Sequence, residues 1–261
     1  MDIRKYNRSA WDRLVENKNE WTVPVSPEVI EKARRGEWSI VMTPLKPVPR
    51  DWFPPSTEGL KVLCLASGGG QQGPVLSAAG SHVTVLDNSP RQLAQDRMVA
   101  QREGLKMRLV EGDMRDLSAF GDGAFDYVVH PTSNLFVPDV LPVWKECYRV
   151  LKPGGTLIAG FCNPIMYMFD LKLEQQGILQ VKYAVPYSDL EHMDDPDRLE
   201  VRGEWDTLEF GHSLEDQIGG QIKAGFYITG FFEDNYRPDE GEVLPNYTST
   251  LITTRAQKPA C

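Results

Sequence analysis

The sequence predicts an α/β fold built on a doubly wound, mostly parallel seven-stranded sheet with an antiparallel strand at the C-terminal end. Three observations predict it. Short apolar runs typical of buried strands recur between residues 61 and 162, capped helical patterns separate them, and two more strand-like runs follow residue 225. Strands and helices that alternate at this spacing form right-handed βαβ units, and the arrangement is Rossmann-like. The last two runs are expected to form an antiparallel pair.

Five central strands account for most of the sheet. They are KVLCLA (61–66), HVTVLD (82–87), MRLVEGD (107–113), FDYVVHP (125–131) and TLIAGFC (156–162). Strands that are apolar at nearly every position are buried on both faces. The best-marked helix covers residues 89–104, with Ser89 as N-cap, Pro90 in the first turn and Gly104 at its end.

The chain divides into four predicted segments. Residues 1–55 form a helical and proline-rich cover, 56–162 the ligand-binding core, 163–212 a lid insertion, and 213–261 a C-terminal helix with the last two strands. In the first segment, short helices are expected over 9–17 and 27–35. Five prolines between residues 44 and 55 predict an extended connector, because proline cannot continue a helix or a central strand.

Composition and charge restrict the classes of function. The net charge of −9 disfavours a nucleic-acid partner, and no stretch has the roughly 20 apolar residues that span a bilayer. Four scattered cysteines and a polar N-terminus without a signal sequence favour reduced thiols and a cytoplasmic location. His192 has no second histidine at ligand spacing, so no metal is expected. We expect a monomer or a homodimer.

The sharpest motif is a glycine loop followed by an acid. The strand 61–66 leads into Ser67, Gly68, Gly69 and Gly70, and Asp87 ends the next strand. In a doubly wound sheet these two strand ends lie side by side, and a carboxylate there can accept hydrogen bonds from ribose hydroxyls. Both a dinucleotide and S-adenosylmethionine fit such a site, because Gly68, Gly70 and Gly73 also have the G-x-G-x-x-G spacing of dinucleotide-binding loops.

Four motifs in order resemble class I S-adenosylmethionine-dependent methyltransferases, particularly the ubiquinone/menaquinone branch known as methyltransferase type 11. They are VLCLASGGG, VTVLDNSPRQLAQ, VEGDMRDL, and FDYVVHPTSNLFV with WKECYRVLKPGGTLIAGF. The resemblance implies S-adenosylmethionine as cofactor, with Asp87 at the ribose, Asp113 at the adenine amino group and Met114 over the ring. The full set of cofactor-binding residues it implies is Tyr6, Trp11, Ala66, Ser67, Gly68, Gly69, Gly70, Gln72, Asp87, Asn88, Ser89, Gly112, Asp113, Met114, His130 and Asn134.

The first motif departs from the family pattern at two positions. Cys64 stands where the family usually has an acid, and Ala66 where it usually has the first glycine. In the family that acid helps to hold the methionine part of the cofactor, often through water. The resemblance therefore implies that another group does this in the present chain, and backbone groups of the loop, Gln71, Gln72 and the N-terminal segment are the candidates.

Methyl transfer needs alignment more than a fixed catalytic residue, because the cofactor brings its own activation. His130, at the carboxyl end of the fourth strand, is the candidate general base, and Asn134 could orient the substrate or the cofactor. Tyr6 and Trp11 are the expected cover of the cofactor. We expect a small-molecule acceptor that is uncharged or cationic. A nicotinamide-dependent oxidoreductase and a non-catalytic cofactor-binding protein are the alternatives.

Overall fold

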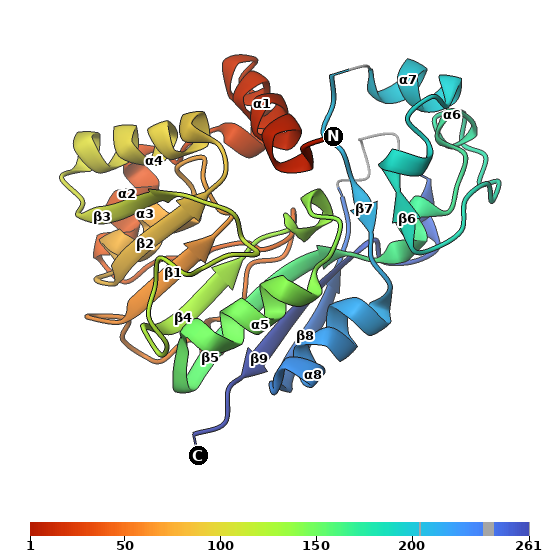
Figure 1. Ribbon diagram of the computed structural model, residues 1–261. Coiled ribbons are helices and arrows are strands. Elements are labelled where there is room, and N and C mark those ends of the chain that lie inside the picture. Colours follow the sequence, from red (N-terminus) through yellow and green to blue (C-terminus); the bar gives the residue numbers. More distant parts are fainter. Residues whose placement is uncertain (204, 237–242, 261) are drawn as a thin grey trace.

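The computed structural model describes residues 1–203, 205–236 and 243–260. Its central sheet has the strand order β3-β2-β1-β4-β5-β9-β8 (Figure 1). The strands are β1 (Lys61–Leu65), β2 (His82–Asp87), β3 (Met107–Glu111), β4 (Phe125–His130), β5 (Leu151–Cys162), β8 (Tyr227–Asp234) and β9 (Leu251–Gln257). Strands β1 to β5 pair in parallel, and β9 is antiparallel to both β5 and β8. The predicted sheet is confirmed.

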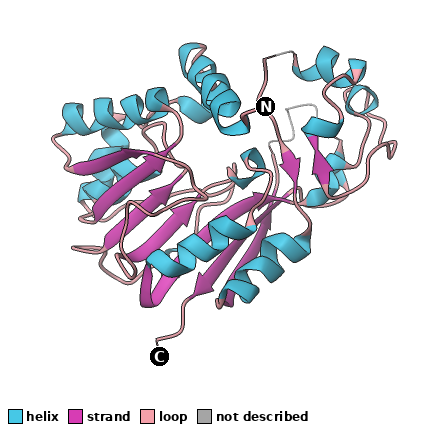
Figure 2. Ribbon diagram, in the orientation of Figure 1, coloured by secondary structure: helices cyan, strands magenta, loops and turns pink. Residues whose placement is uncertain are grey.

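Helices cover both faces of the sheet (Figure 2). They are α1 (Ile3–Glu16), α2 (Pro27–Arg34), α3 (Gln72–Ala78), α4 (Pro90–Glu103), α5 (Leu141–Val150), α6 (Leu171–Glu174), α7 (Pro196–Arg202) and α8 (Gly220–Ala224). In β1, Val62 and Cys64 pack with α2, α3 and α4, whereas Leu63 and Leu65 pack with α5 and the region of α8. Successive strand residues face opposite layers, which explains the uninterrupted apolar run.

The ends of the helices follow from their caps. Helix α4 begins after Ser89, whose hydroxyl accepts the Gln92 amide at 3.1 Å, and Gly104 ends it in the left-handed region, as predicted. The first helix begins six residues earlier than predicted, because Asp2 caps it by accepting the Lys5 amide at 3.0 Å. The predicted helix after residue 212 is a wide π turn (Glu215–Gly219) that continues into α8.

Residues 41–44 run along the end of the sheet beside β4 and β5. The Met42 carbonyl accepts the amide of Thr132 at 3.0 Å and its hydroxyl at 2.9 Å. Gly160 makes this approach possible, since a Cβ atom at that position would lie 2.5 Å from the Met42 carbonyl oxygen. The proline-rich connector is thereby fixed against the sheet.

Residues 163–212 form a separate layer at the side of the molecule, with α6, α7 and a two-stranded sheet of β6 (Tyr187–Ser188) and β7 (Phe210–Gly211) (Figure 1). A fully buried carboxylate, Asp189, organises it. Asp189 accepts hydrogen bonds from Arg198 at 2.8 and 2.9 Å, from the Tyr187 hydroxyl at 2.8 Å and from the Glu209 amide at 2.7 Å. A buried charge with this many partners favours a single local geometry.

Three cysteines, Cys64, Cys147 and Cys162, are free buried thiols, and Cys261 lies outside the described residues. Among the described residues, no helix is long and apolar enough to cross a membrane. No cluster of three or more His, Cys, Asp or Glu side chains within these ranges could hold a metal ion.

We expect Gly160→Ala to lower the free energy of unfolding by about 1–3 kcal/mol, because the added methyl group would displace the Met42 backbone from β5. Thermal denaturation measures the effect. Gly121→Ala is the matched control, since a Cβ atom there would meet nothing within 4 Å. Equal melting temperatures for the two variants would contradict the close approach described above.

Candidate active site

The glycine loop joins β1 to α3 in a conformation that suits small residues. Gly69 and Gly70 have φ of 104° and 75°, and Ala66 also lies in the left-handed region, at φ 46°. Ala66 therefore adopts a conformation that glycine reaches without the steric penalty of a Cβ atom. A Cβ atom at Gly68 would lie 2.6 Å from Gln92 Cβ and 2.9 Å from Asp87 Oδ2. The loop thus packs directly on the start of α4 and on the acid that ends β2.

Asp87 ties the loop to the neighbouring strands. Its Oδ2 accepts the Gly68 amide at 2.8 Å, and its Oδ1 accepts the Ser89 amide at 2.8 Å. Burial raises the pKa of Asp87 to about 6. The hydrogen bonds from these amides limit the rise, and the nearby Asp12 carboxylate adds to it. A carboxylate oxygen has capacity beyond one hydrogen bond, so Asp87 can still accept from a ligand.

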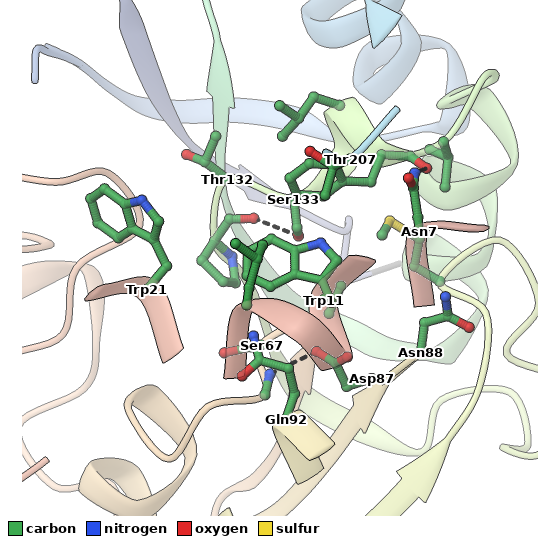
Figure 3. Close-up of a pocket in the computed structure, with 18 of the residues that line it drawn as sticks. Asn7, Trp11, Trp21, Ser67, Asp87, Asn88, Gln92, Thr132, Ser133 and Thr207 are labelled. Carbon is green, nitrogen blue, oxygen red and sulfur yellow. Dashed lines mark hydrogen bonds between the residues drawn. The ribbon is translucent and has the colours of Figure 1, made fainter. Parts of the chain in front are cut away.

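A cavity of about 370 Å³ opens in front of this carboxylate. Figure 3 shows Ser67, Asp87 and Gln92 at one end of it and Thr132, Ser133 and Thr207 at the other. Nine of the predicted cofactor residues in the core line the cavity: Ala66, Ser67, Gly68, Gln72, Asp87, Asn88, Gly112, Asp113 and Met114. The first three motifs therefore meet at one surface.

Gln92 lines the cavity and was missed from the sequence. Ser89 and Gln92 have the spacing of a capping box, in which the glutamine would accept the Ser89 amide. Asp87 takes that amide instead, and the buried Gln92 Oε1 is left without a hydrogen-bond partner. An unsatisfied polar atom beside a cavity is costly in the free protein and is suited to a ligand that donates to it. The capping-box spacing of Ser89 and Gln92 is the sequence pattern from which Gln92 could have been predicted to lie at this end of α4.

Asp113 is held by a second missed residue, Arg115. Burial alone would raise the pKa of Asp113, but the side-chain and backbone hydrogen bonds from Arg115 outweigh it, and the pKa is lowered. Arg115 Nη2 lies 2.7 Å from Asp113 Oδ2, and its Nε lies 3.1 Å from Oδ1. The charged carboxylate is therefore fixed in orientation at the cavity wall, beside Gly112 and Met114.

Helix α1 covers the cavity, and its contacts there involve three of the predicted cofactor residues: Asn88, Ser89 and its own Trp11. Arg4 Nε donates to Asn88 Oδ1 at 3.0 Å, and Asn88 Nδ2 donates to the Arg4 carbonyl at 2.8 Å. The Ser89 hydroxyl donates to Asp12 at 2.6 Å. Trp11 lines the cavity and meets Phe136 edge to face, with ring centroids 5.2 Å apart.

Asn7 is the least exposed side chain of α1 after Ala10 and connects three parts of the chain. Its Nδ2 donates to the carbonyls of Phe136 and Leu208 at 3.0 and 2.9 Å, and its Oδ1 accepts the Leu208 amide at 2.7 Å. Asn7 also lines the cavity. The residues after β4 and the 163–212 segment are thereby joined to the covering helix, a role that sequence spacing could not reveal.

Six predicted residues do not line the cavity: Tyr6, Gly69, Gly70, Ser89, His130 and Asn134. His130 is fully buried, its Nδ1 lies 2.9 Å from the Leu65 carbonyl, and its Nε2 has no hydrogen-bond partner in the part of the chain that the structure describes. Burial lowers the pKa of His130 to about 4, which keeps the ring neutral near pH 7. Asn134 is also fully buried and donates to Gln217 Oε1 at 2.9 Å.

The far end of the cavity combines apolar side chains with hydroxyl groups and the carboxylates of Asp206 and Glu209. Its lining residues include Met42, Pro44, Leu135, Phe136, Tyr236 and Leu251, with the hydroxyls of Thr43, Thr132, Ser133 and Thr207 between them. The Thr43 hydroxyl is buried and has no hydrogen-bond partner. The lining residues in the described ranges include no histidine, lysine or cysteine.

Comparison with known proteins separates the two ligand classes that the glycine loop left open. Residues 63–159 match the family described as a methyltransferase domain. The chain is 58% identical over 253 residues to the methyltransferase YbaJ of Bacillus subtilis, covering 97% of both chains. It is 38% identical over 101 residues to a sterol 24-C-methyltransferase of Aspergillus fumigatus, covering 38% of this chain and 26% of that protein.

A solved structure supports the same fold. The S-adenosylmethionine-dependent methyltransferase from Mesorhizobium loti superposes with a TM-score of 0.62 at 17% identity, covering 80% of this chain and 95% of that one. The near-complete match to a methyltransferase and the order of the motifs around one cavity favour a methyl donor over a dinucleotide. The chain therefore belongs to the class I S-adenosylmethionine-dependent methyltransferases.

Proposed function

We propose that the chain methylates a small, mostly apolar acceptor inside the cavity beneath α1. The observation that carries this proposal is the half-enclosed shape of the cavity, which α1 partly covers. The motif residues lie at one end, an apolar region lies at the other, and α1 and the 163–212 segment partly cover both. A protein or nucleic-acid chain needs an open groove, whereas a volume of about 370 Å³ is in the usual range for small ligands.

At the motif end, each lining residue suits one part of the cofactor. We assign Asp87 to the ribose hydroxyls, Asp113 and Met114 to the adenine, and the backbone of the glycine loop to the methionine part. The free Gln92 oxygen adds an acceptor beside Asp87, which supports a polar ligand at this end. When bound, the cofactor supplies a methyl group activated on a sulfonium.

At the other end, the chain positions an acceptor rather than deprotonating it. Two carboxylates line the cavity here: Glu209 accepts from Arg202 at 2.7 Å and Asp206 accepts the Thr207 amide at 2.7 Å, and each keeps capacity to accept a further hydrogen bond from the acceptor. His130 is buried behind the wall, and we assign it to the packing of β4 on β1. Because the described lining residues include no histidine, lysine or cysteine, we infer that the acceptor carries a nucleophile that is available near neutral pH. Alignment and exclusion of water are worth several kcal/mol of the barrier.

Cofactor affinity is expected to decrease as the pH is lowered, because Asp87 must be ionised to accept two ribose hydrogen bonds. Its raised pKa of about 6 means that affinity is constant above pH 7 and decreases by up to about tenfold per pH unit below 6. Calorimetric titration of S-adenosylhomocysteine from pH 5 to 8 measures this. Asp87→Asn, which cannot ionise, should bind weakly with a flatter profile. A constant affinity of the unaltered chain across this range would contradict the assignment.

Asn7→Ala is expected to loosen the cover. The change removes three hydrogen bonds and leaves the buried Leu208 amide unsatisfied, so the free energy of unfolding should fall by about 1–3 kcal/mol. Cofactor affinity should fall by about tenfold, because the closed position of α1 becomes less populated. Ser9→Ala, on an exposed part of the same helix, is the control and should change neither quantity. Unchanged affinity in Asn7→Ala would show that the cover is not needed for binding.

The acceptor class can be tested with a radiolabelled methyl donor and a fractionated cell extract. Label should enter the small-molecule fraction, and Pro44→Trp, which fills the apolar end of the cavity, should abolish that transfer without weakening S-adenosylhomocysteine binding. Label that enters only protein or nucleic acid would refute a small-molecule acceptor. The labelled fraction then identifies the acceptor by mass spectrometry.

A further inference from the structure

A buried acid on α4, Asp96, has no role in the site described so far. Its side chain is fully buried, and neither carboxyl oxygen has a hydrogen-bond partner among the described residues. Burial raises the pKa of Asp96 well above its usual value. An unpaired buried carboxyl group destabilises a free protein, and its presence needs a reason.

Asp96 lies behind the glycine loop. Its Oδ1 is 3.4 Å from the position that a Cβ atom of Gly73 would occupy, at the start of α3. The backbone amides of Gly70 and Gly69 lie close enough to lower the pKa of Asp96 against the effect of burial. The Asp96 carboxyl therefore faces the inner side of the same loop whose outer side lines the cavity.

The strand beneath the loop provides no charge of its own. Cys64, in β1, is fully buried, and burial raises the pKa of its thiol well above the usual value, so the thiol stays neutral. The charge of Asp96 raises the pKa of this thiol further. The Asp87 carboxylate, at the end of β2, also raises the pKa of Asp96. A carboxyl group is thus present behind the loop, but it comes from α4 and not from β1.

We propose that Asp96 is a positioning residue for the cofactor: its carboxyl group, supplied from α4, packs behind the glycine loop and the start of α3 and supports the loop conformation that binds the methionine part. Ala66 gives the loop a reason for such support, because it carries a Cβ atom in the left-handed region, whereas Gly69 and Gly70 adopt positive φ without a steric penalty. Groups that are strained or unsatisfied in the free protein concentrate at functional sites, where ligand binding compensates for them.

The first test separates binding from stability in one variant, Asp96→Asn. We expect S-adenosylhomocysteine affinity to fall by about tenfold or more, while the melting temperature of the free chain stays the same or rises, since a desolvated acid is removed. Asp126→Asn is the control. Asp126 accepts the Lys61 amide at 2.9 Å and Lys152 Nζ at 2.6 Å, at the opposite ends of the strands, so this variant should lose stability and keep its affinity. Unchanged affinity in Asp96→Asn would overturn the proposal.

The second test moves the acid to β1. Cys64→Asp adds a second buried carboxyl group within reach of the charge of Asp96, and we expect both the melting temperature and the cofactor affinity to fall. Adding Asp96→Asn should restore affinity to within about threefold of the unaltered chain, because one carboxyl group again supports the loop. A double variant that binds no better than Cys64→Asp alone would assign Asp96 a purely structural role. Both tests measure cofactor binding in the absence of an acceptor, so their results do not depend on whether the acceptor proposed above is correct.

Discussion

The site depends on the convergence of two backbone amides, from Gly68 and Ser89, on the carboxylate of Asp87. One amide belongs to the loop after β1 and the other to the start of α4. The Asp87 carbonyl also accepts the Gly112 amide after β3, at 3.0 Å. The ends of three strands are thereby joined around one residue. Burial of that carboxylate is unfavourable, and the amides that compensate for it also fix the floor of the cavity.

The cover is held by polar contacts more than by apolar packing. Helix α1 has only two buried side chains, Asn7 and Ala10. Beside the ring contact of Trp11 with Phe136, its contacts with the core include hydrogen bonds of Arg4, Asp12 and Asn7 and an ion pair between Arg8 and Glu111. Hydrogen bonds of this kind contribute modest net stability, because water competes for each partner once the helix moves away. A cover built in this way can open without exposing a large apolar surface, while its closed position remains specific.

Much of the fold could be predicted because its signals are local. Buried parallel strands give continuous apolar runs, and Ser89 and Gly104 mark the ends of α4. The positions of Asp87 and Asp113 at the strand ends follow from the same topology. The sequence did not predict Asn7, Arg115 and Asp96, because what each does depends on partners that only folding brings together. Asn7 contacts a residue 201 positions away, and no spacing rule relates such pairs.

His130 shows a different limit of sequence reasoning. Its place at the carboxyl end of β4 is the place where an active-site residue is expected, and the strand does end there. The direction of the side chain is decided by the Leu65 carbonyl, which it meets behind the cavity wall. A residue at the right end of a strand can thus face either the ligand or the neighbouring strand, and one sequence does not distinguish these orientations.

The ion pair between Asp189 and Arg198 has a consequence for selectivity. It shapes the layer that carries Thr207 and Glu209 to the cavity through buried hydrogen bonds internal to that layer. That wall is preorganised, so we expect the proposed acceptor to be selected by its fit to an existing surface. The wall does not need to rearrange when the acceptor binds. In relatives that keep the core motifs but replace this buried pair, the wall of the cavity would have a different shape. Substrate specificity can therefore change in this segment while the methyl-donor end of the site stays the same.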